Sequence, residues 1–216
     1  MPEVLKISSD KPESALIAKA VNTLKKGGVI AYPTETFYGL GVDGGNEKAI
    51  EKIFRIKGRN FKNPVSVIIG DDRYLIHLAE DVPEISRKLM KIFWPGALTI
   101  VFKASSHVSH LLTAGTGKIG VRVSSHPITA ALSKAFAHPI TATSANVSGV
   151  MECTTAAEVI QCIGDRVDLV IDGGQTPGIM GSTIIDVTTS PPVILRAGII
   201  PAALLSEVIV SSMPLT

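Results

Sequence analysis

The sequence has few of the residues that build disulfide frameworks. Only two cysteines, Cys153 and Cys162, occur among 216 residues, and they match no CxxC pattern, so a disulfide-rich scaffold is excluded. Long apolar runs are also missing, because two prolines, a serine and a glutamate interrupt the apolar stretch of residues 197–215. The N-terminus has no basic segment followed by an apolar one. We therefore expect a cytoplasmic protein with no membrane span and no signal peptide.

Two nucleotide-binding signatures are absent or incomplete. The sequence contains no GxxxxGK[ST] segment, so a P-loop enzyme is excluded. Gly39, Gly41 and Gly44 do form a GxGxxG, but the polar and aromatic residues 34–38 separate it from the preceding apolar run. No acidic residue lies about 20 positions on at the end of a second strand, where a ribose ligand is expected. A dinucleotide-binding fold is therefore not expected.

Metal and hydrolase sites also lack their signatures. His107 and His110 have no third histidine, cysteine or carboxylate close in sequence, which favours a solvated loop pair over a metal site. Ser144 is not in a GxSxG elbow, and His126 has no obvious acidic partner. A hydrolase triad is therefore weakly supported.

The composition is that of an ordinary globular protein, with 45% hydrophobic and 19% charged residues. A chain of this length most simply forms one domain, so we expect a single domain over residues 1–216. The net charge of +2 is uneven, because residues 1–103 hold 16 basic and 12 acidic side chains whereas the remainder holds 5 and 7. This excess suits a polyanionic partner, although solvated helix faces explain it as well.

Hydrophobic periodicity predicts a mixture of helices and strands. Apolar residues recur at helical spacing from Ile17 to Leu24, and Asn46 is placed to cap a helix that runs through Arg55. Further helices are expected over residues 82–93, 128–136, 154–163 and 201–210. Strands are expected over residues 29–33, 65–69, 98–102, 119–123, 167–171, 182–187 and 192–198. This order favours an α/β (mixed α+β) fold, with a twisted, mixed parallel and antiparallel sheet flanked by helices.

Six polar clusters lie at the expected ends of strands. They are PTETFYG (33–39), KGRNFKNP (57–64), VRVSSHP (121–127), TATSANVSG (141–149), GST (181–183) and LRAG (195–198). They contain four cations, Lys57, Arg59, Arg122 and Arg196. If the clusters converge, they form a basic concave site rich in hydroxyls, which suits phosphates or carboxylates. Each cluster also has a structural explanation: Gly58 can cap a helix, and SANVSG can form a hydrogen-bonded turn.

Taken in order, these motifs resemble those of the YrdC family. The matching segments are PTETFYGLG, KGR followed by NP, WPGALTIVF, GVRVSSHP, TATSANVSG, GSTIIDV and ILRAG. The resemblance runs from about Ile7 to Ile199, and the combination is specific although each segment alone is not. It implies a mixed α/β fold with a positively lined concave surface.

The resemblance also implies an activity, that of a nucleotidyltransferase that makes L-threonylcarbamoyl-adenylate. L-threonine and bicarbonate would form a carbamate, which attacks the α-phosphate of ATP and releases pyrophosphate. Other tRNA-modification proteins would use the adenylate to make N6-threonylcarbamoyladenosine in tRNA. Mg²⁺ would be held mainly by ATP, because no metal-ligand cluster is visible in the sequence. Direct binding of tRNA, if it occurs, is expected to be weak and salt-dependent.

The family motifs assign roles to residues of this sequence. The resemblance implies a catalytic polar set around the nucleotide, formed by Lys57, Arg59, Ser144 and Asn146. ATP would also contact Asn63 and Arg196. Arg122 would hold the threonine carboxylate, which suits a bidentate guanidinium, and the other threonine-binding residues would be Thr34, Thr36 and Ser182. No strong general base stands out, so positioning and charge neutralisation would carry the catalysis.

Three positions depart from the family pattern. Asn60 and Ser124 stand where many relatives have proline, and Ile68 replaces a histidine that some two-domain relatives use near the threonine. Two alternatives stay open. One is an RNA-binding module without catalysis, and the other is a carbamoyl-adenylate enzyme with another acceptor.

Overall fold

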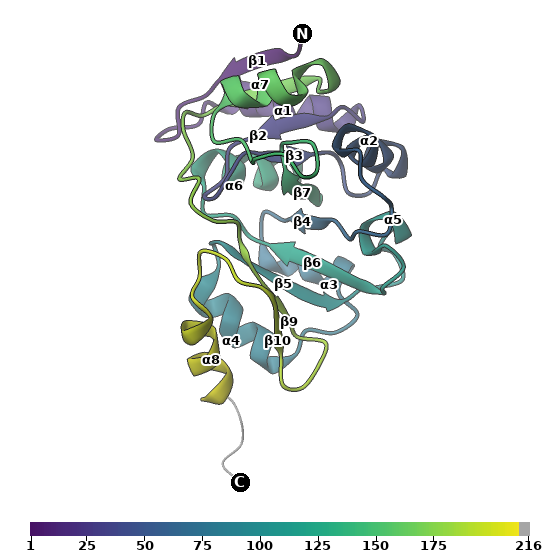
Figure 1. The fold of residues 1–216 in the computed structure, drawn as a ribbon, viewed down its shortest axis with the longest axis vertical. Helices are drawn as coiled ribbons and strands as arrows, with labels where there is room; N and C mark the ends of the chain where they lie inside the picture. The colour runs from purple at the N-terminus through teal and green to yellow at the C-terminus, as the bar shows by residue number, and fades with distance from the viewer. Residues whose placement is uncertain (212–216) are drawn as a thin grey trace.

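The computed structural model describes residues 1–211 and places ten strands in one sheet that runs the length of the molecule (Figure 1). The last residues of the apolar stretch 197–215 lie outside that description. The strand order is β1-β8-β2-β3-β7-β4-β6-β5-β9-β10. The strands are β1 (Glu3–Lys6), β2 (Ile30–Tyr32), β3 (Gly39–Gly41), β4 (Ser66–Ile68), β5 (Leu98–Lys103), β6 (Lys118–Arg122), β7 (Ile140–Ser144), β8 (Leu169–Asp172), β9 (Thr183–Asp186) and β10 (Val193–Arg196).

The sheet is mixed, as the sequence predicts. Four neighbouring pairs are parallel, β1 with β8, β2 with β8, β4 with β6, and β5 with β9. The remaining pairs are antiparallel. The helices are α1 (Ser14–Lys25), α2 (Glu47–Lys57), α3 (Leu75–Leu78), α4 (Glu84–Phe93), α5 (His110–Thr113), α6 (Pro127–Phe136), α7 (Ala156–Ile163) and α8 (Ala202–Val210). No helix of residues 1–211 is long and apolar enough to cross a membrane.

Alternate residues of the strands feed two hydrophobic clusters on opposite faces of the sheet. Ile30 and Tyr32 of β2 pack with apolar residues of α1 and α6, whereas Ala31 packs with those of α2, α4 and α7. This alternation follows from the two-residue period of a strand. In β6 and β4 the same period turns Arg122 and Ile68 toward the face of α1 and α6, because Val121 and Val67 belong to the opposite cluster.

Helix α2 positions two of the predicted cations. Asn46 accepts a hydrogen bond from Ala49 N and caps its start, as predicted. Gly58 ends it in the left-handed conformation at φ 58°, with its N–H bonded to Arg55 O. Because the chain turns there, Lys57 in the last helical turn and Arg59 just beyond it leave the same helix end. The predicted cap at Gly58 is therefore confirmed, and the functional role of Lys57 and Arg59 stays a prediction.

The stretch after β2 contains a strand that was not among those expected from the sequence. Gly39 to Gly41 form β3, paired with both β2 and β7. The glycines are required because a Cβ at Gly41 would lie 2.6 Å from Tyr32 Cε1 and one at Gly39 2.9 Å from Tyr32 Cζ. The absence of a side chain at these two glycines therefore lets the backbone of β3 pack against the ring of Tyr32. Gly39 and Gly41 of the GxGxxG lie within a strand, whereas a dinucleotide fingerprint needs them in a turn before a helix.

Candidate active site

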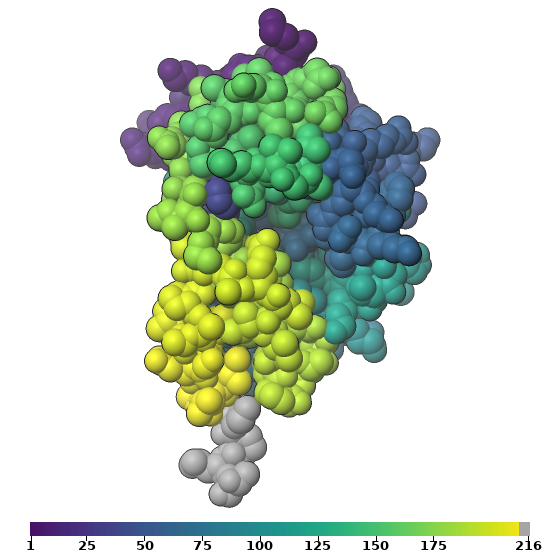
Figure 2. All heavy atoms as spheres, in the orientation of Figure 1, coloured from purple at the N-terminus to yellow at the C-terminus, as the bar shows by residue number. Residues whose placement is uncertain are grey.

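The molecule is hollowed between three segments distant in sequence. Figure 2 shows the hollow between the yellow C-terminal part, the green segment before α7 and the blue segment after α2. It is a cavity of about 730 Å³, of the size that holds small-molecule ligands. All ten residues predicted for the site line it, namely Thr34, Thr36, Lys57, Arg59, Asn63, Arg122, Ser144, Asn146, Ser182 and Arg196.

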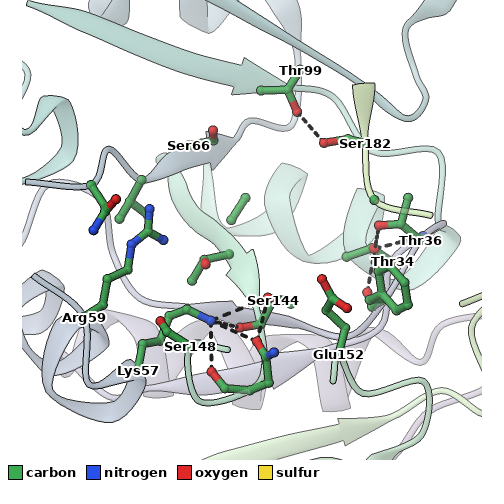
Figure 3. Close-up of a pocket in the computed structure, with 18 of the residues that line it drawn as sticks. Thr34, Thr36, Lys57, Arg59, Ser66, Thr99, Ser144, Ser148, Glu152 and Ser182 are labelled. Carbon is green, nitrogen blue, oxygen red and sulfur yellow. Dashed lines mark hydrogen bonds between the residues drawn. The ribbon is translucent and has the colours of Figure 1, made fainter. Parts of the chain in front are cut away.

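Lys57 lies at the centre of a hydrogen-bonded set with the end of β7. Its Nζ donates to Ser144 O at 2.6 Å, to Asn146 O at 2.9 Å and to Asn146 Oδ1 at 3.0 Å. Ser144 Oγ donates to the same Oδ1 at 2.6 Å, and Asn146 Nδ2 donates to Val150 O at 2.5 Å. These three acceptors match the three protons of an ammonium. Lys57 therefore holds residues 144–146, called the SAN turn below, in place beside the cavity (Figure 3).

The environment of Lys57 also changes its acidity. Its residue is only 3% exposed, and burial together with the nearby charge of Arg59 lowers its pKa to about 8. Burial disfavours the charged form of a base. Lys57 therefore loses its proton at a pH where an ordinary lysine keeps it.

The second cation of this segment reaches along the wall of the cavity. Arg59 donates from Nη2 to Pro64 O at 3.0 Å, which leaves donors of its guanidinium for a ligand. Burial lowers its pKa from the ordinary value, but an arginine stays charged in proteins. Asn63 follows in the same loop, where its Nδ2 donates to Asn60 O at 3.4 Å.

The opposite wall combines an arginine with two hydroxyls. Arg196 at the end of β10 donates from Nε and Nη2 to Ser182 O, at 3.0 and 2.7 Å, and from Nη2 to Ser182 Oγ at 2.9 Å. Ser182 Oγ is also 2.9 Å from Thr99 Oγ1. Arg196 thus holds Ser182 in place as well as lining the cavity. Burial lowers the pKa of Arg196.

The two threonines of the PTETFYG segment form a local turn. Thr34 Oγ1 donates to Phe37 O at 2.7 Å, accepts from Thr36 N at 3.1 Å, and lies 3.0 Å from Thr36 Oγ1. Both threonines are buried. Such a side-chain turn holds a short loop in one conformation. The threonines therefore present a fixed hydroxyl edge to the cavity.

Arg122 is the most deeply buried of the three arginines. Its residue is 6% exposed, and it lines the cavity from β6. Glu35 is the one carboxylate of residues 1–211 within ion-pair distance, at 3.6 Å from Nε. A buried guanidinium without enough acceptors is costly, so this side chain suits an anionic ligand with two oxygens.

The cavity lining also contains polar residues that have no role predicted from the sequence. Among them are Ser66, Thr99 and Glu152 (Figure 3). Thr99 interrupts the apolar run LTIVF, which is the signal that would have found it, because a buried strand has little reason to carry one hydroxyl. Glu152 is the one carboxylate among the described residues that line the cavity. Nothing in its sequence context distinguishes it from a solvated glutamate.

The donors in the cavity do not form a protein-only metal site. Within residues 1–211 no group of three or more histidines, cysteines or carboxylates lies together. The other oxygen donors of the lining are hydroxyls, amides and carbonyls. Such a set suits an ion that takes most of its ligands from its own substrate and from water.

Several known proteins are similar to this chain in sequence. A family model described as telomere recombination, covering Sua5, YciO and YrdC, matches residues 22–198. The chain is 38% identical over 200 residues to a threonylcarbamoyl-AMP synthase of Pyrococcus abyssi, across 93% of this chain and 59% of that protein. It is 31% identical over 209 residues to a putative threonylcarbamoyl-AMP synthase of Mycobacterium tuberculosis, across 97% and 96%.

A solved structure extends the comparison to three dimensions. The crystal structure of P. abyssi Sua5 complexed with L-threonine aligns with a TM-score of 0.92 at 36% identity, across 95% of this chain and 60% of that one. The chain thus spans less than two thirds of the length of these P. abyssi relatives.

Proposed function

This chain belongs to the Sua5/YciO/YrdC family, and we propose that it is a threonylcarbamoyl-AMP synthase. Its substrates would be L-threonine, bicarbonate and ATP, and its products L-threonylcarbamoyl-adenylate and pyrophosphate. The observation that carries the proposal is the convergence of ten residues, from Thr34 to Arg196, on one cavity. A relative of that name and a structure with bound L-threonine support the same reading.

The charges of the cavity suit the substrates. The triphosphate, the threonine carboxylate and the carbamate are all anionic, so bringing them together requires cations. Arg59 and Arg196 both line the cavity and would bind the phosphates of the nucleotide. Arg122 would bind the threonine carboxylate, where its planar fork offers two parallel hydrogen bonds. The amine of threonine would then stay free to react with bicarbonate.

Positioning carries most of the proposed catalysis. The threonine amine attacks the carbon of bicarbonate, water leaves, and a carbamate forms. A carbamate oxygen then attacks the α-phosphorus of ATP, and the bond to the β-phosphate oxygen breaks to release pyrophosphate. The turn held by Lys57 and the hydroxyls of Thr34, Thr36 and Ser182 would fix the two reactants against one another.

Mg²⁺ is part of the proposal because ATP carries it. When bound, the ion would neutralise phosphate charge and favour the departure of pyrophosphate. Its protein contact would come from Glu152, the carboxylate of the lining, with other ligands from ATP and water.

Identification of the product tests the proposal and the acceptor together. The purified protein would be incubated with ATP, Mg²⁺, bicarbonate and one amino acid at a time, and the adenylate identified by mass spectrometry. We expect threonylcarbamoyl-adenylate from threonine and little product from alanine or leucine. Equal yields of the corresponding adenylates from alanine or leucine would contradict the threonine assignment.

Partners and compartment follow from the same proposal. Proteins that transfer the threonylcarbamoyl group to tRNA would consume the adenylate, in the cytoplasm. Binding of tRNA by this chain would be weak and steeply salt-dependent, because only backbone charge would be recognised. Tight, salt-resistant tRNA binding without adenylate formation would favour the RNA-binding module instead.

A further inference from the structure

A buried ion pair lies directly behind the cavity. Glu35 Oε1 is 3.6 Å from Arg122 Nε, and the two side chains are 15% and 7% exposed. Ser124, which is itself buried, donates a hydrogen bond to the other carboxylate oxygen of Glu35. Arg122 lines the cavity, and Glu35 does not. Glu35 therefore contacts the arginine from outside the cavity lining.

The atoms of this contact are not saturated by the protein. Within residues 1–211, Arg122 Nε and Glu35 Oε1 are both buried and neither makes a hydrogen bond. Burying such groups unpaired is costly. Their charges still attract one another strongly at this separation, because little water lies around them. The pair is thus held by charge, and its geometry leaves the terminal nitrogens of Arg122 for another oxyanion.

We propose that Glu35 is a positioning residue that orients Arg122 so that its two terminal nitrogens face the cavity and bind the substrate carboxylate. The identity of that carboxylate, L-threonine, rests on the proposed function. Ser124 fixes the carboxylate of Glu35, and Glu35 holds the Nε edge of the guanidinium. The opposite edge then matches the two oxygens of the substrate. Ser124, which departs from the proline of many relatives, is part of this arrangement.

A simple charge effect predicts the opposite result. If Glu35 only offset the charge of Arg122, its removal would strengthen the attraction between Arg122 and an incoming carboxylate, and the threonine KM would fall. If Glu35 orients Arg122, its removal lets the guanidinium turn toward water in the cavity. Threonine must then restore the binding geometry, and its KM rises.

Glu35→Gln separates these two effects, because it removes the charge and keeps the size and both polar atoms. We expect a rise in the threonine KM of about ten-fold or more, which is the scale of one charged contact. We expect kcat at saturating threonine within about three-fold of wild type, and unchanged ATP binding without threonine. An unchanged or lower threonine KM would overturn the proposal. So would a matching loss of kcat and ATP binding, which would show a structural role.

A double-mutant cycle shows whether Glu35 acts through Arg122. In an Arg122→Ala background, Glu35→Gln should raise the threonine KM no further. It should also raise the Tm of that background, because it removes a largely buried negative charge that has lost its cation, whereas it lowers the Tm of wild type. Additive effects on the threonine KM would contradict the positioning role.

A matched control separates general destabilisation from positioning. Asp186→Asn breaks another ion pair with a buried carboxylate, Asp186 Oδ2 with Lys118 Nζ at 2.8 Å, in which the aspartate side chain is 6% exposed and the lysine 38%. Asp186 does not line the cavity. This variant should lose stability and keep the threonine KM. A rise equal to that of Glu35→Gln would overturn the proposal.

Pyrophosphate release by the wild-type protein, measured with and without threonine, distinguishes failure of the proposed function from failure of the positioning role of Glu35. Pyrophosphate release that ignores threonine in wild type would refute the proposed function. The Tm cycle with Arg122→Ala would still decide whether Glu35 holds Arg122. Threonine-dependent release in wild type with an unaffected Glu35→Gln variant would refute the positioning role alone.

Discussion

Lys57 Nζ lies 3.0 Å from Asn146 Oδ1, although 89 positions separate the two residues in the chain. This contact joins the end of α2 to the turn after β7. Both residues belong to the polar set that the family resemblance places around the nucleotide. We therefore expect Lys57 to affect ATP binding mainly by holding the turn of residues 144–146 in place.

Replacing Lys57 by methionine should damage both stability and ATP binding. Three oxygens, on Ser144 and Asn146, would lose the Lys57 donor. Ser144 O keeps Asn146 N and Asn146 Oδ1 keeps Ser144 Oγ, so within residues 1–211 Asn146 O is the one left unmet, which costs about 1–3 kcal/mol where water cannot reach it. We expect the free energy of unfolding to fall by about 2 kcal/mol or more, measured by urea denaturation. Lys52→Met is the control, because Lys52 donates to Gly27 O at 2.7 Å from the same helix but away from the cavity. Equal ATP affinity in the two variants would contradict the role of Lys57.

The pKa of Lys57 predicts a pH dependence. Its folded value of about 8 lies below the ordinary 10.5, so folding releases a proton between these values. This group therefore makes the unfolding free energy rise with pH across that window. Deprotonation also removes one of three donors from the SAN turn, so ATP affinity should fall as pH rises through about 8. Calorimetric titration with ATP between about pH 7 and pH 10 would show it. An ATP affinity that does not change over that pH range would contradict a role for the Lys57 proton in ATP binding.

Arg59 and Arg122 should serve different substrates. Each charged hydrogen-bonded contact contributes about 1.5–3 kcal/mol, or on the order of ten- to a hundred-fold in affinity. Arg122→Ala should weaken threonine use by that factor and leave ATP binding, measured without threonine, nearly intact. Arg59→Ala should weaken ATP binding at any threonine concentration. Arg122→Lys should rescue only in part, because a point charge cannot copy a bidentate fork.

The structure adds a condition to this pair of variants. Arg122 lines the cavity and also pairs with Glu35, so Arg122→Ala should lower the Tm more than Arg59→Ala does. Circular dichroism and a thermal melt would check that both variants are folded. If Arg122→Ala lost ATP affinity and kept its threonine dependence, the placement of the two substrates would be wrong.

Periodic segments of the fold could be predicted from the sequence, because burial on one face leaves a visible pattern. Helix α1 and strand β5 were found in this way. Strand β3 was not, because Gly-Leu-Gly has little intrinsic preference for a strand and pairs only when Tyr32 and the neighbouring strands are in place. Strand β1 was missed as well, since a four-residue edge strand shows too little alternation.

The candidate site likewise contains residues that could be predicted from the sequence and residues that could not. Its ten residues were found through the order of seven motifs, which carries information about the fold that no single motif holds. The positions of Glu35 and Thr99 depend on how β6, β9 and the PTETFYG segment meet in space. Sequence separation hides such contacts, so Glu35 could be recognised only in the structure, whereas the sequence marks Thr99 as a single hydroxyl in an apolar run but does not reveal its partner.

The close contact between strand β3 and the ring of Tyr32 can be tested by overpacking. An alanine Cβ at position 41 would lie 2.6 Å from Tyr32 Cε1 and 2.7 Å from Ile140 Cγ2. Gly41→Ala should therefore lower the free energy of unfolding by about 1–3 kcal/mol, the usual cost of overpacking. Gly45→Ala is the control, because its Cβ would meet only Asp43 Oδ1 at 3.4 Å. Equal urea midpoints for the two variants would show that the ring of Tyr32 can move aside.

The central claim is the joint use of three substrates, and pyrophosphate release measures it most directly. The purified protein would be supplied with Mg·ATP, L-threonine and bicarbonate, and each component would be omitted in turn from carbonate-depleted buffer. We expect pyrophosphate only when all three are present, because the carbamate that attacks the α-phosphate needs both threonine and bicarbonate. Equal release without bicarbonate would contradict carbamate chemistry and indicate a plain adenylating enzyme.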